Sequence, residues 1–435
     1  MNETHDAKLA SWVESANDPA TDFPIQNLPF GVFDRGDGPR IGTAIGDQIF
    51  DLRACAEGGL LAGIDELTRD ACARPRLNAL MSLGRGASTA LRRKCAELLS
   101  DGAPRRPDLL IPMTAAKMLL PADIGDYTDF YASIHHATNV GRMFRPDNPL
   151  LPNYKYVPIG YHGRASSIVP SGQAVTRPLG QIRPDPNAPP EFAASRLLDY
   201  ELEVGAFIGA GNYLGQRIPV AHAGEHIFGL CLVNDWSARD IQSWEYQPLG
   251  PFLAKSLATT ISPWVVTADA LEPFRVEPPA RAEGDPEPLD YLRDEADRQS
   301  GAFDIVLDVS LNGAPITRTR FGASMYWTLA QLVAHHASNG CNLRPGDLIA
   351  SGTVSGPAEG EQGCLLELTQ RGARPLRLAN GEERRFLQDG DEVIFRGWCE
   401  RDGYRRIGFG ECRGTVRPAS STEERPVVSI PRPTW

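Results

Sequence analysis

The chain has 435 residues, which is long enough for more than one domain, because a single hydrophobic core rarely extends beyond about 250 to 300 residues. Its 42% hydrophobic and 23% charged residues exclude a disordered chain and a coiled coil. The formal net charge of -11, without a long run of Lys or Arg, argues against nucleic acid as a partner.

The first residues predict a soluble, untargeted protein. Up to Trp12 the chain is polar and acidic, where a signal peptide would be basic and then apolar, and no apolar stretch reaches about 18 residues. The eight cysteines contain no C-x-x-C pair, which is typical of reduced thiols rather than of a zinc cage or a disulfide framework. We therefore expect a cytoplasmic protein that does not bind a membrane.

Short strands are expected in the N-terminal part. Residues 30–33, 40–45 and 48–52 are separated by Gly-Asp turns, which predicts a small β-barrel-like unit. A helix is predicted at 88–99. The Pro- and Gly-containing run at 101–107 is typical of an interdomain linker, so we place a domain boundary near residue 120.

The rest of the chain is predicted to be mostly antiparallel β-structure. Helices are few, the clearest being 327–338, and the strands do not alternate with helices as they would in a doubly wound sheet. Two proline-rich stretches, 183–191 and 277–288, are expected to be surface loops away from the chemistry. The predicted strands are 202–208, 227–233, 303–311, 348–351, 364–368 and 392–397.

Alternating carboxylates mark the start of one predicted strand. The pleat places Asp199, Glu201 and Glu203 on one face, where like charges would repel each other unless a cation neutralises them. A solvated acidic face is an equally acceptable interpretation of this segment alone. Asp235 follows the apolar run 227–233, which is typical both of a site residue and of a helix cap. Oxygen ligands would favour calcium, magnesium or manganese over zinc.

Two other positions each allow a catalytic and a structural interpretation. Lys255 is one of five lysines among 44 basic residues, which indicates either a need for a compact ammonium group or an ordinary surface lysine. His135 and His136 follow Asp129 and Tyr131 closely, so this segment offers either an imidazole base or a structural histidine.

A five-residue segment, His222-Ala223-Gly224-Glu225-His226, matches the H-x-x-E-H pattern of one group of zinc peptidases. Pro219 before it and Gly224 inside it make a poor helix, so we expect a solvent-facing turn before the strand at 227–233. The sequence contains no glycine motif for nucleotide binding and no G-x-S-x-G motif of serine hydrolases.

Four segments together resemble the fumarylacetoacetase family. They are residues 126–141, 158–167, 234–255 and 342–347, and they include the motifs D-Y-T-D-F-Y, H-A-T-N and N-D-W-S-A-R-D-I-Q. The resemblance extends over nearly the whole chain. These motifs are typical of the full-length enzyme, whereas the E-x-E pair at 201–203 is shared with related hydrolases, decarboxylases and isomerases.

The resemblance implies a mainly β (α+β) fold, with a small SH3-like β-barrel domain at 1–120 and a mixed β-sandwich roll as the catalytic domain at 121–435, paired into a homodimer. It also implies hydrolysis of the carbon-carbon bond of 4-fumarylacetoacetate, a diketo acid, to fumarate and acetoacetate, the last step of tyrosine and phenylalanine breakdown. The alternative is a related lyase or isomerase that acts on another oxo acid. A His/Glu pair that activates water would favour the hydrolase.

Roles for the catalytic residues are also implied by the resemblance. His136 is expected to be the base that activates water, held by Glu367, while His135 stands where better-known members of the family carry glutamine. Arg239, Gln242 and Lys255 are expected to stabilise the tetrahedral oxyanion and the departing acetoacetate.

The resemblance further implies a cation site and a set of substrate contacts. The expected calcium ligands are Asp129, Glu201, Glu203 and Asp235. Magnesium is expected near Asp235, Lys255 and Thr259. The expected substrate contacts are Tyr131, Arg145, Tyr161, Arg239, Gln242, Tyr246 and Thr353.

Overall fold

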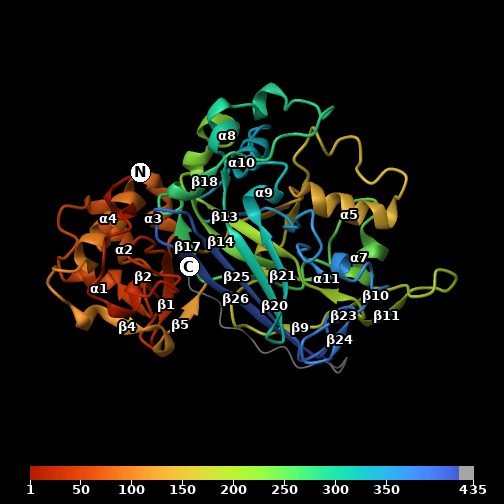
Figure 1. Cartoon of the computed structure of the whole chain (residues 1–435), viewed down its shortest axis with the longest axis horizontal. Coiled ribbons are helices and arrows are strands. Elements are labelled where there is room, and N and C mark those ends of the chain that lie inside the picture. Colours follow the sequence, from red (N-terminus) through yellow and green to blue (C-terminus); the bar gives the residue numbers. More distant parts are fainter. Residues whose placement is uncertain (421–435) are drawn as a thin grey trace.

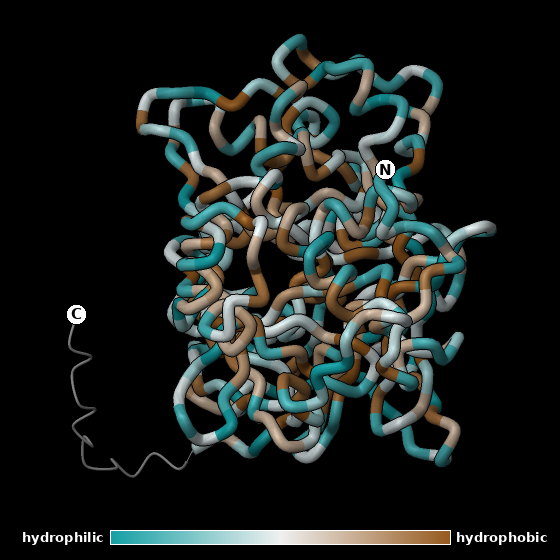
Figure 2. The backbone as a smooth tube through the Cα atoms, turned by 90° about the vertical axis from the view of Figure 1, so that its left-hand side faces the viewer, coloured by the Kyte–Doolittle hydropathy of each residue, from teal (hydrophilic) through white to brown (hydrophobic). Residues whose placement is uncertain are grey.

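A computed structural model gives the fold and describes residues 1–420; the predicted end of the catalytic domain, 421–435, lies outside the described residues. The N-terminal residues, red to orange in Figure 1, form a lobe at one end of the molecule beside a larger body built mainly of strands. Figure 2 shows hydrophobic stretches of the chain inside the molecule and hydrophilic stretches on its outer turns. This architecture confirms the predicted mainly β fold class.

The largest sheet continues from the N-terminal lobe into the larger body. Its 13 strands are β1 (Phe30–Asp34), β2 (Arg40–Ile45), β3 (Gln48–Asp51), β4 (Leu110–Pro112), β5 (Lys117–Leu119), β6 (Tyr127–Phe130), β7 (Gly160–Gly163), β8 (Ile168–Pro170), β13 (Leu202–Ile208), β14 (Ile227–Asp235), β16 (Thr259–Ile261), β17 (Trp264–Thr267) and β22 (Leu348–Ala350). The main path is β4-β3-β2-β1-β17-β14-β13-β22-β6-β7. Its pairs are antiparallel except β22 with β6, and the side strand β8 is parallel to β16.

A second sheet packs against the first and buries a common core with it. Its strands are, in the order β21-β20-β25-β26-β9, Ala314–Arg320, Val306–Leu311, Glu392–Cys399, Ile407–Arg417 and Val175–Thr176. Leu230 and Leu232 of β14 belong to the same buried cluster as Leu307 of β20 and Phe395 of β25. Burial of apolar side chains between two layers is the main stabilising contribution in such a fold.

The remaining strands form two-stranded ribbons. The pairs are β10 (Leu179–Ile182) with β11 (Glu191–Ala194), β12 (Leu198–Asp199) with β15 (Ser237–Ala238), β18 (Arg275–Val276) with β19 (Ala302–Phe303), and β23 (Leu376–Arg377) with β24 (Glu383–Arg384). The loop 183–191 therefore joins the two strands of an outlying hairpin, as expected for a surface loop.

Helices are mostly short in the described part of the chain. The predicted helix at 88–99 is confirmed as α4, which begins earlier, at Gly84, and the helix within 327–338 is confirmed as α10. The helices are α1 (Leu52–Glu57), α2 (Glu66–Cys72), α3 (Asn78–Ser82), α4 (Gly84–Leu99), α5 (Ile134–Phe144), α6 (Val220–Ala223), α7 (Arg239–Glu245), α8 (Glu295–Ser300), α9 (Phe321–Ser324), α10 (Leu329–His336) and α11 (Leu365–Leu368).

Two strand predictions are wrong in detail. Residues 364–368 form the helical turn α11 instead of a strand, because the carboxylate of Asp199 accepts hydrogen bonds from the backbone N–H groups of Leu365 and Leu366 and so caps the turn. The stretch 303–311 is broken into β19 and β20, which belong to different sheets.

The N-terminal strands do not close into the expected barrel within the described residues. β1 pairs with β2 and β5, but it also pairs with β17, so Phe30 lies opposite Val265 and the sheet continues into the larger body. Residues 101–107, expected to link two domains, instead lead from α4 to β4, which pairs with β3. The domain boundary near residue 120 stays a prediction.

A buried ion pair fastens the N-terminal lobe to the larger body. Arg92 of α4 is fully buried, and its Nη1 lies 2.7 Å from Oδ2 of Asp269, which follows β17. We expect Arg92→Met to lower the free energy of unfolding by about 3 kcal/mol, because the substitution leaves the Asp269 carboxylate buried without its charge partner. Urea unfolding followed by circular dichroism measures this loss.

The neighbouring Arg93 provides a matched control. Arg93 pairs with Glu3 at the surface, where both side chains are mostly exposed. Arg93→Met should therefore leave the urea midpoint within experimental error of the unmodified protein, since surface ion pairs contribute little. An Arg92→Met variant that unfolds at the unmodified midpoint would contradict the proposed importance of the buried pair.

Candidate active site

Four acidic side chains meet where neighbouring strands of the large sheet end. Asp129 lies in β6, Glu203 in β13 and Asp235 at the end of β14, while Glu201 immediately precedes β13. One carboxylate oxygen from each lies within 4.8 Å of the others, and all four side chains are buried. We call these residues the acidic quartet. The structure thus brings together the four carboxylates expected from the sequence.

The charges of the acidic quartet are only partly balanced by protein groups. Neither carboxylate oxygen of Glu203 has a hydrogen-bond partner among the described residues, and neither does Oδ1 of Asp129. Burial raises the pKa of Glu203 well above its ordinary value, and the charge of Asp129 raises it further. The pKa of Asp129 is raised by burial and by Asp235. Buried carboxylates without partners are costly, so this half of the quartet fits a bound cation.

The other half of the acidic quartet contacts two buried cations of the protein. Lys255 Nζ donates hydrogen bonds to Glu201 and, at 2.8 Å, to Asp235 Oδ2. Arg239 Nη1 lies 2.8 Å from Glu201 Oε1. Burial would raise the pKa of Glu201, but the charges of Lys255 and Arg239 outweigh it and lower that pKa to about 2. Lys255 is therefore not an ordinary surface lysine.

Asp199 was expected to share a face with Glu201 and Glu203, but it is not a member of the acidic quartet. The extended chain is interrupted between Asp199 and Leu202, so strand alternation does not continue through these positions. Besides capping α11, the Asp199 carboxylate accepts a hydrogen bond of 2.9 Å from Arg239 Nε. Asp199 therefore orients Arg239 instead of adding a fifth carboxylate to the acidic quartet.

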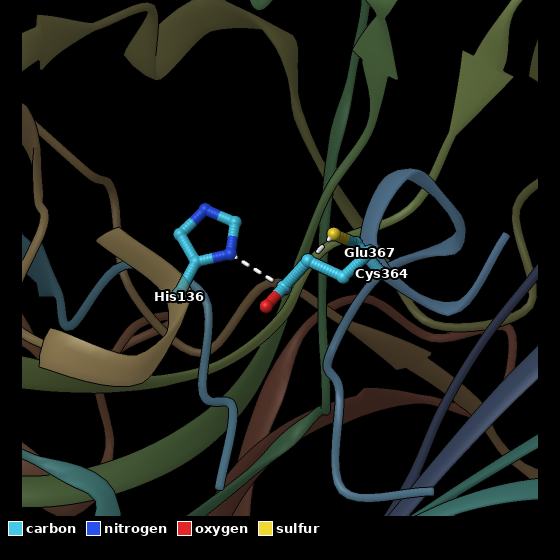
Figure 3. A group of neighbouring side chains, drawn as sticks. All are labelled: His136, Cys364 and Glu367. Carbon is cyan, nitrogen blue, oxygen red and sulfur yellow. Dashed lines mark hydrogen bonds and ion pairs between the residues drawn. The ribbon is translucent and has the colours of Figure 1, made fainter. Parts of the chain in front are cut away.

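A buried His/Glu pair connects two segments that are 231 positions apart in the sequence. His136 Nδ1 and Glu367 Oε2 are 2.6 Å apart, and Figure 3 marks this contact with a dashed line. His136 lies in the first turn of α5, which Ser133 caps, and Glu367 lies in α11. Burial raises the pKa of Glu367, but contact with His136 and hydrogen bonds from Asn139 and Ser355 outweigh it, so that pKa is lowered. We call this pair the dyad.

The contact at Nδ1 leaves the other ring nitrogen of His136 available for chemistry. When Nδ1–H donates to the ionised Glu367, Nε2 carries the lone pair, and it has no partner among the described residues. In Figure 3 the second ring nitrogen points away from Glu367. The ring of Tyr131 meets the imidazole edge-on, with 5.2 Å between the ring centres. This arrangement suits a base that takes a proton from water.

Several of the residues expected at the site contact the acidic quartet or its neighbours. Tyr161 donates a hydrogen bond of 2.6 Å to Asp235. Thr259 donates one of 3.3 Å to the same carboxylate. Gln242 Oε1 accepts a hydrogen bond of 3.2 Å from Arg239. Thr353 is buried in the loop that follows β22. Their roles toward substrate or cation stay predictions.

Two other expected substrate contacts lie outside this cluster. Arg145, directly after α5, is exposed and donates to the backbone oxygen of Pro149 at 3.3 Å. Tyr246, directly after α7, is also exposed. His135 is half-buried and makes no hydrogen bond to Glu367 within the described part of the chain, and burial lowers its pKa. The assignment of Arg145 and Tyr246 to the substrate site depends on the family resemblance alone.

Some site neighbours were missed by the sequence analysis. Asn139 lies three positions after His136 in α5 and donates to Glu367, so helical spacing could have indicated it. No local pattern marks Ser355, which reaches Glu367 from a loop. The loop at 277–288 was expected away from the chemistry, yet its Asp285 forms an ion pair with Lys155. The residue before Lys155 is Tyr154, and its hydroxyl donates a hydrogen bond to the backbone oxygen of Tyr131.

The alternative zinc site is not formed. His222 and Glu225 are exposed, with 3.8 Å between Nδ1 and Oε1, and His226 Nδ1 contacts the backbone oxygen of Ala210 at 2.6 Å. The segment forms α6 and a short 3₁₀ turn before β14, as predicted. All eight cysteines are free. Across residues 1–420, none of the helices has the length and apolarity needed to cross a membrane.

Comparisons with known proteins show the family of the chain. Models of the Fumarylacetoacetate (FAA) hydrolase C-terminal and Fumarylacetoacetase N-terminal families match residues 127–417 and 26–121. The chain is 53% identical to fumarylacetoacetase of Bos taurus over 430 residues, which cover 94% of this chain and 99% of that protein. The chain is 52% identical to fumarylacetoacetase of Homo sapiens, and the match covers 94% of this chain and 99% of that protein. It is 49% identical to fumarylacetoacetase of Arabidopsis thaliana, with coverage of 95% and 99%.

A solved structure agrees at the level of the fold. The fumarylacetoacetate hydrolase of Exiguobacterium antarcticum superposes with a TM-score of 0.52 at 18% sequence identity, covering 90% of this chain and 99% of that one.

Proposed function

We propose, since the chain belongs to the fumarylacetoacetase family, that it hydrolyses 4-fumarylacetoacetate to fumarate and acetoacetate, the last step of tyrosine and phenylalanine breakdown. The observation that carries this proposal is the buried His136–Glu367 pair, together with the four converging carboxylates of the acidic quartet. A water-activating dyad and a cation site together suit hydrolysis of a diketone.

The acidic quartet would hold a divalent cation, which we take to be Ca²⁺ or Mg²⁺. Four carboxylate oxygens without sulfur or imidazole suit these hard ions, and the unpartnered oxygens of Glu203 and Asp129 support the assignment. Asp235, with Lys255 and Thr259 beside it, is the side where we place magnesium. A bound cation would supply Lewis-acid stabilisation for negative charge that develops on the diketone oxygens.

His136 begins the reaction by taking a proton from water at Nε2. The hydroxide adds to the substrate carbonyl carbon next to the fumaryl double bond and forms a tetrahedral oxyanion. Glu367 stays ionised and stabilises the imidazolium, since its carboxylate already accepts the Nδ1–H bond at 2.6 Å. This use of the dyad distinguishes hydrolysis from the lyase and isomerase reactions of related proteins.

Arg239 and Lys255 then stabilise the negative charge on the substrate. Arg239 Nη2 is buried without a hydrogen-bond partner among the described residues, so it can donate to the oxyanion. Gln242 accepts a hydrogen bond from Arg239 and adds a second polar side chain beside it. When the oxyanion collapses, the bond to the adjacent CH₂ carbon breaks and the electron pair stays on that carbon. It takes a proton from His136 and becomes the methyl group of acetoacetate.

Substrate recognition completes the proposal. The terminal carboxylates of fumarylacetoacetate suit Arg145 and the hydroxyls of Tyr131, Tyr161, Tyr246 and Thr353. We place this activity in a cytoplasmic homodimer. Exposed apolar side chains after α7, among them Leu249 with 98% and Phe252 with 71% exposure, support an association surface.

Hydrolysis is tested directly with the purified chain. Supplied with fumarylacetoacetate and Ca²⁺ or Mg²⁺, the protein should remove the diketone absorbance and release fumarate and acetoacetate in equal amounts. In ¹⁸O-labelled water one oxygen of the new fumarate carboxylate should carry the label, because hydroxide adds to that carbon. A folded, cation-loaded protein without turnover would overturn the proposal, and a product without label would favour a lyase or isomerase.

A further inference from the structure

The Glu367 carboxylate is held by more groups than His136. Asn139 Nδ2 donates to Oε1 at 2.8 Å, and Ser355 Oγ donates to Oε2 at 2.8 Å. Cys364 Sγ lies 3.2 Å from the same Oε2, and Figure 3 shows Cys364 beside Glu367. Glu367 is itself 5% exposed, so these contacts replace water around a buried charge.

We propose that Asn139 and Ser355 are positioning residues of the reaction, which fix the Glu367 carboxylate and limit how strongly it attracts the proton of His136. This inference rests on the proposed function. Neither residue contacts the acidic quartet through any hydrogen bond in the described part of the chain. The side chains of both residues donate to Glu367.

The loop that contains Ser355 contacts the elements that carry His136 and Glu367. Ser355 Oγ accepts a hydrogen bond of 3.0 Å from the Gly363 N–H, just before α11. The Ser355 backbone oxygen accepts one of 3.0 Å from Ser133 Oγ. Ser133 caps the helix that carries His136. Ser355 therefore links the start of α5 to α11, and Asn139 makes a second link from one helical turn after His136.

The charge argument gives the effect a direction. Hydrogen bonds from Asn139 and Ser355 share the negative charge of Glu367, so less of it stabilises a protonated imidazole. Removing one donor should strengthen the hold of Glu367 on the His136 proton, and the imidazole should then titrate at higher pH. A base must be neutral to act, so the acid limb of kcat/KM moves to higher pH as well.

Other titratable groups face the dyad, and the substitutions leave them in place. Tyr131 lies beside His136, and Cys364 beside Glu367. Glu201 and Arg239 lie on the side of the acidic quartet, and His135 is the neighbour of His136 in α5. Burial raises the pKa of the Cys364 thiol well above its ordinary value, so it remains a neutral, weak donor.

The test compares Asn139→Leu and Ser355→Ala with two controls in the full-length, cation-loaded chain. Thr138→Val changes the neighbouring residue of α5, whose hydroxyl donates to the Ile134 backbone and not to Glu367. Ser355→Thr keeps the hydroxyl. We expect each test variant to lower kcat about 10- to 100-fold with KM within about twofold, and to move the acid limb upward. Thr138→Val and Ser355→Thr should stay near the unmodified values.

A readout without substrate separates this inference from the proposed function. In protein labelled with ¹³C at histidine Cε1, NMR titration reports the midpoint of His136, assigned by the signal lost in His136→Ala. Both test variants should raise that midpoint whether or not fumarylacetoacetate is the substrate. An unchanged midpoint in a folded Asn139→Leu variant overturns the inference, even if Ser355→Ala fails to fold. An equal shift in Thr138→Val would overturn it too.

Discussion

Replacing His136 with alanine is expected to lower kcat by about 10²- to 10⁴-fold and to leave KM nearly unchanged. The side chain is buried, its Nδ1 is fixed 2.6 Å from Glu367, and its Nε2 is left to take the proton of the attacking water. Fumarylacetoacetate would still bind, because the arginine, tyrosine and lysine side chains assigned to it remain. Steady-state kinetics on the diketone absorbance measure both constants.

The adjacent histidine is the matched control. His135 is half-buried on a different face of α5 and makes no hydrogen bond to Glu367 within residues 1–420. His135→Ala should therefore keep most of the activity. Glu367→Gln, which retains the shape but removes the charge, should approach the loss seen in His136→Ala. If His135→Ala were inactive and His136→Ala active, the base would have to be reassigned to His135.

Part of the site could be predicted from local sequence. Glu201 and Glu203 do meet in the acidic quartet as the spacing predicted, although Glu201 lies just before β13, and Asp235 at the end of β14 lies beside them. Asp199 does not join them, because its carboxylate is taken by Arg239 and by the backbone of α11. Nothing in the local pattern predicts the long-range contact between Asp199 and α11.

The dyad could not be predicted from local sequence at all. His136 and Glu367 are 231 positions apart, and the segment around Glu367 has the apolar composition of a short strand. Only the family resemblance connected the two residues. The N-terminal strands were predicted correctly one by one, but their barrel did not close, because the pairing of β1 with β17 depends on the tertiary arrangement.

The acidic quartet should make the stability of the protein depend on its cation. Without one, burial raises the pKa values of Asp129 and Glu203 in the folded state above their ordinary values of about 4. The folded protein then binds more protons than the unfolded chain, so its stability falls as pH rises from about 4 toward the raised folded values. A bound cation removes this loss. The gain in Tm on adding Ca²⁺ or Mg²⁺ should therefore increase with pH over that range.

Replacing Glu203 with glutamine should weaken cation binding without destabilising the folded protein. Both oxygens of Glu203 are buried without partners, so the substitution should raise the Tm of the cation-free protein while reducing cation affinity at least about 100-fold and abolishing turnover. The unmodified protein gains about 2.7 kcal/mol from a ligand at 100 times its Kd, and the variant should gain almost nothing at the same concentration.

Calorimetric titration and thermal unfolding measure these effects. Glu225→Gln, at an exposed carboxylate away from the acidic quartet, should change neither. A Glu203→Gln variant that keeps the full cation-dependent rise in Tm would place the cation elsewhere.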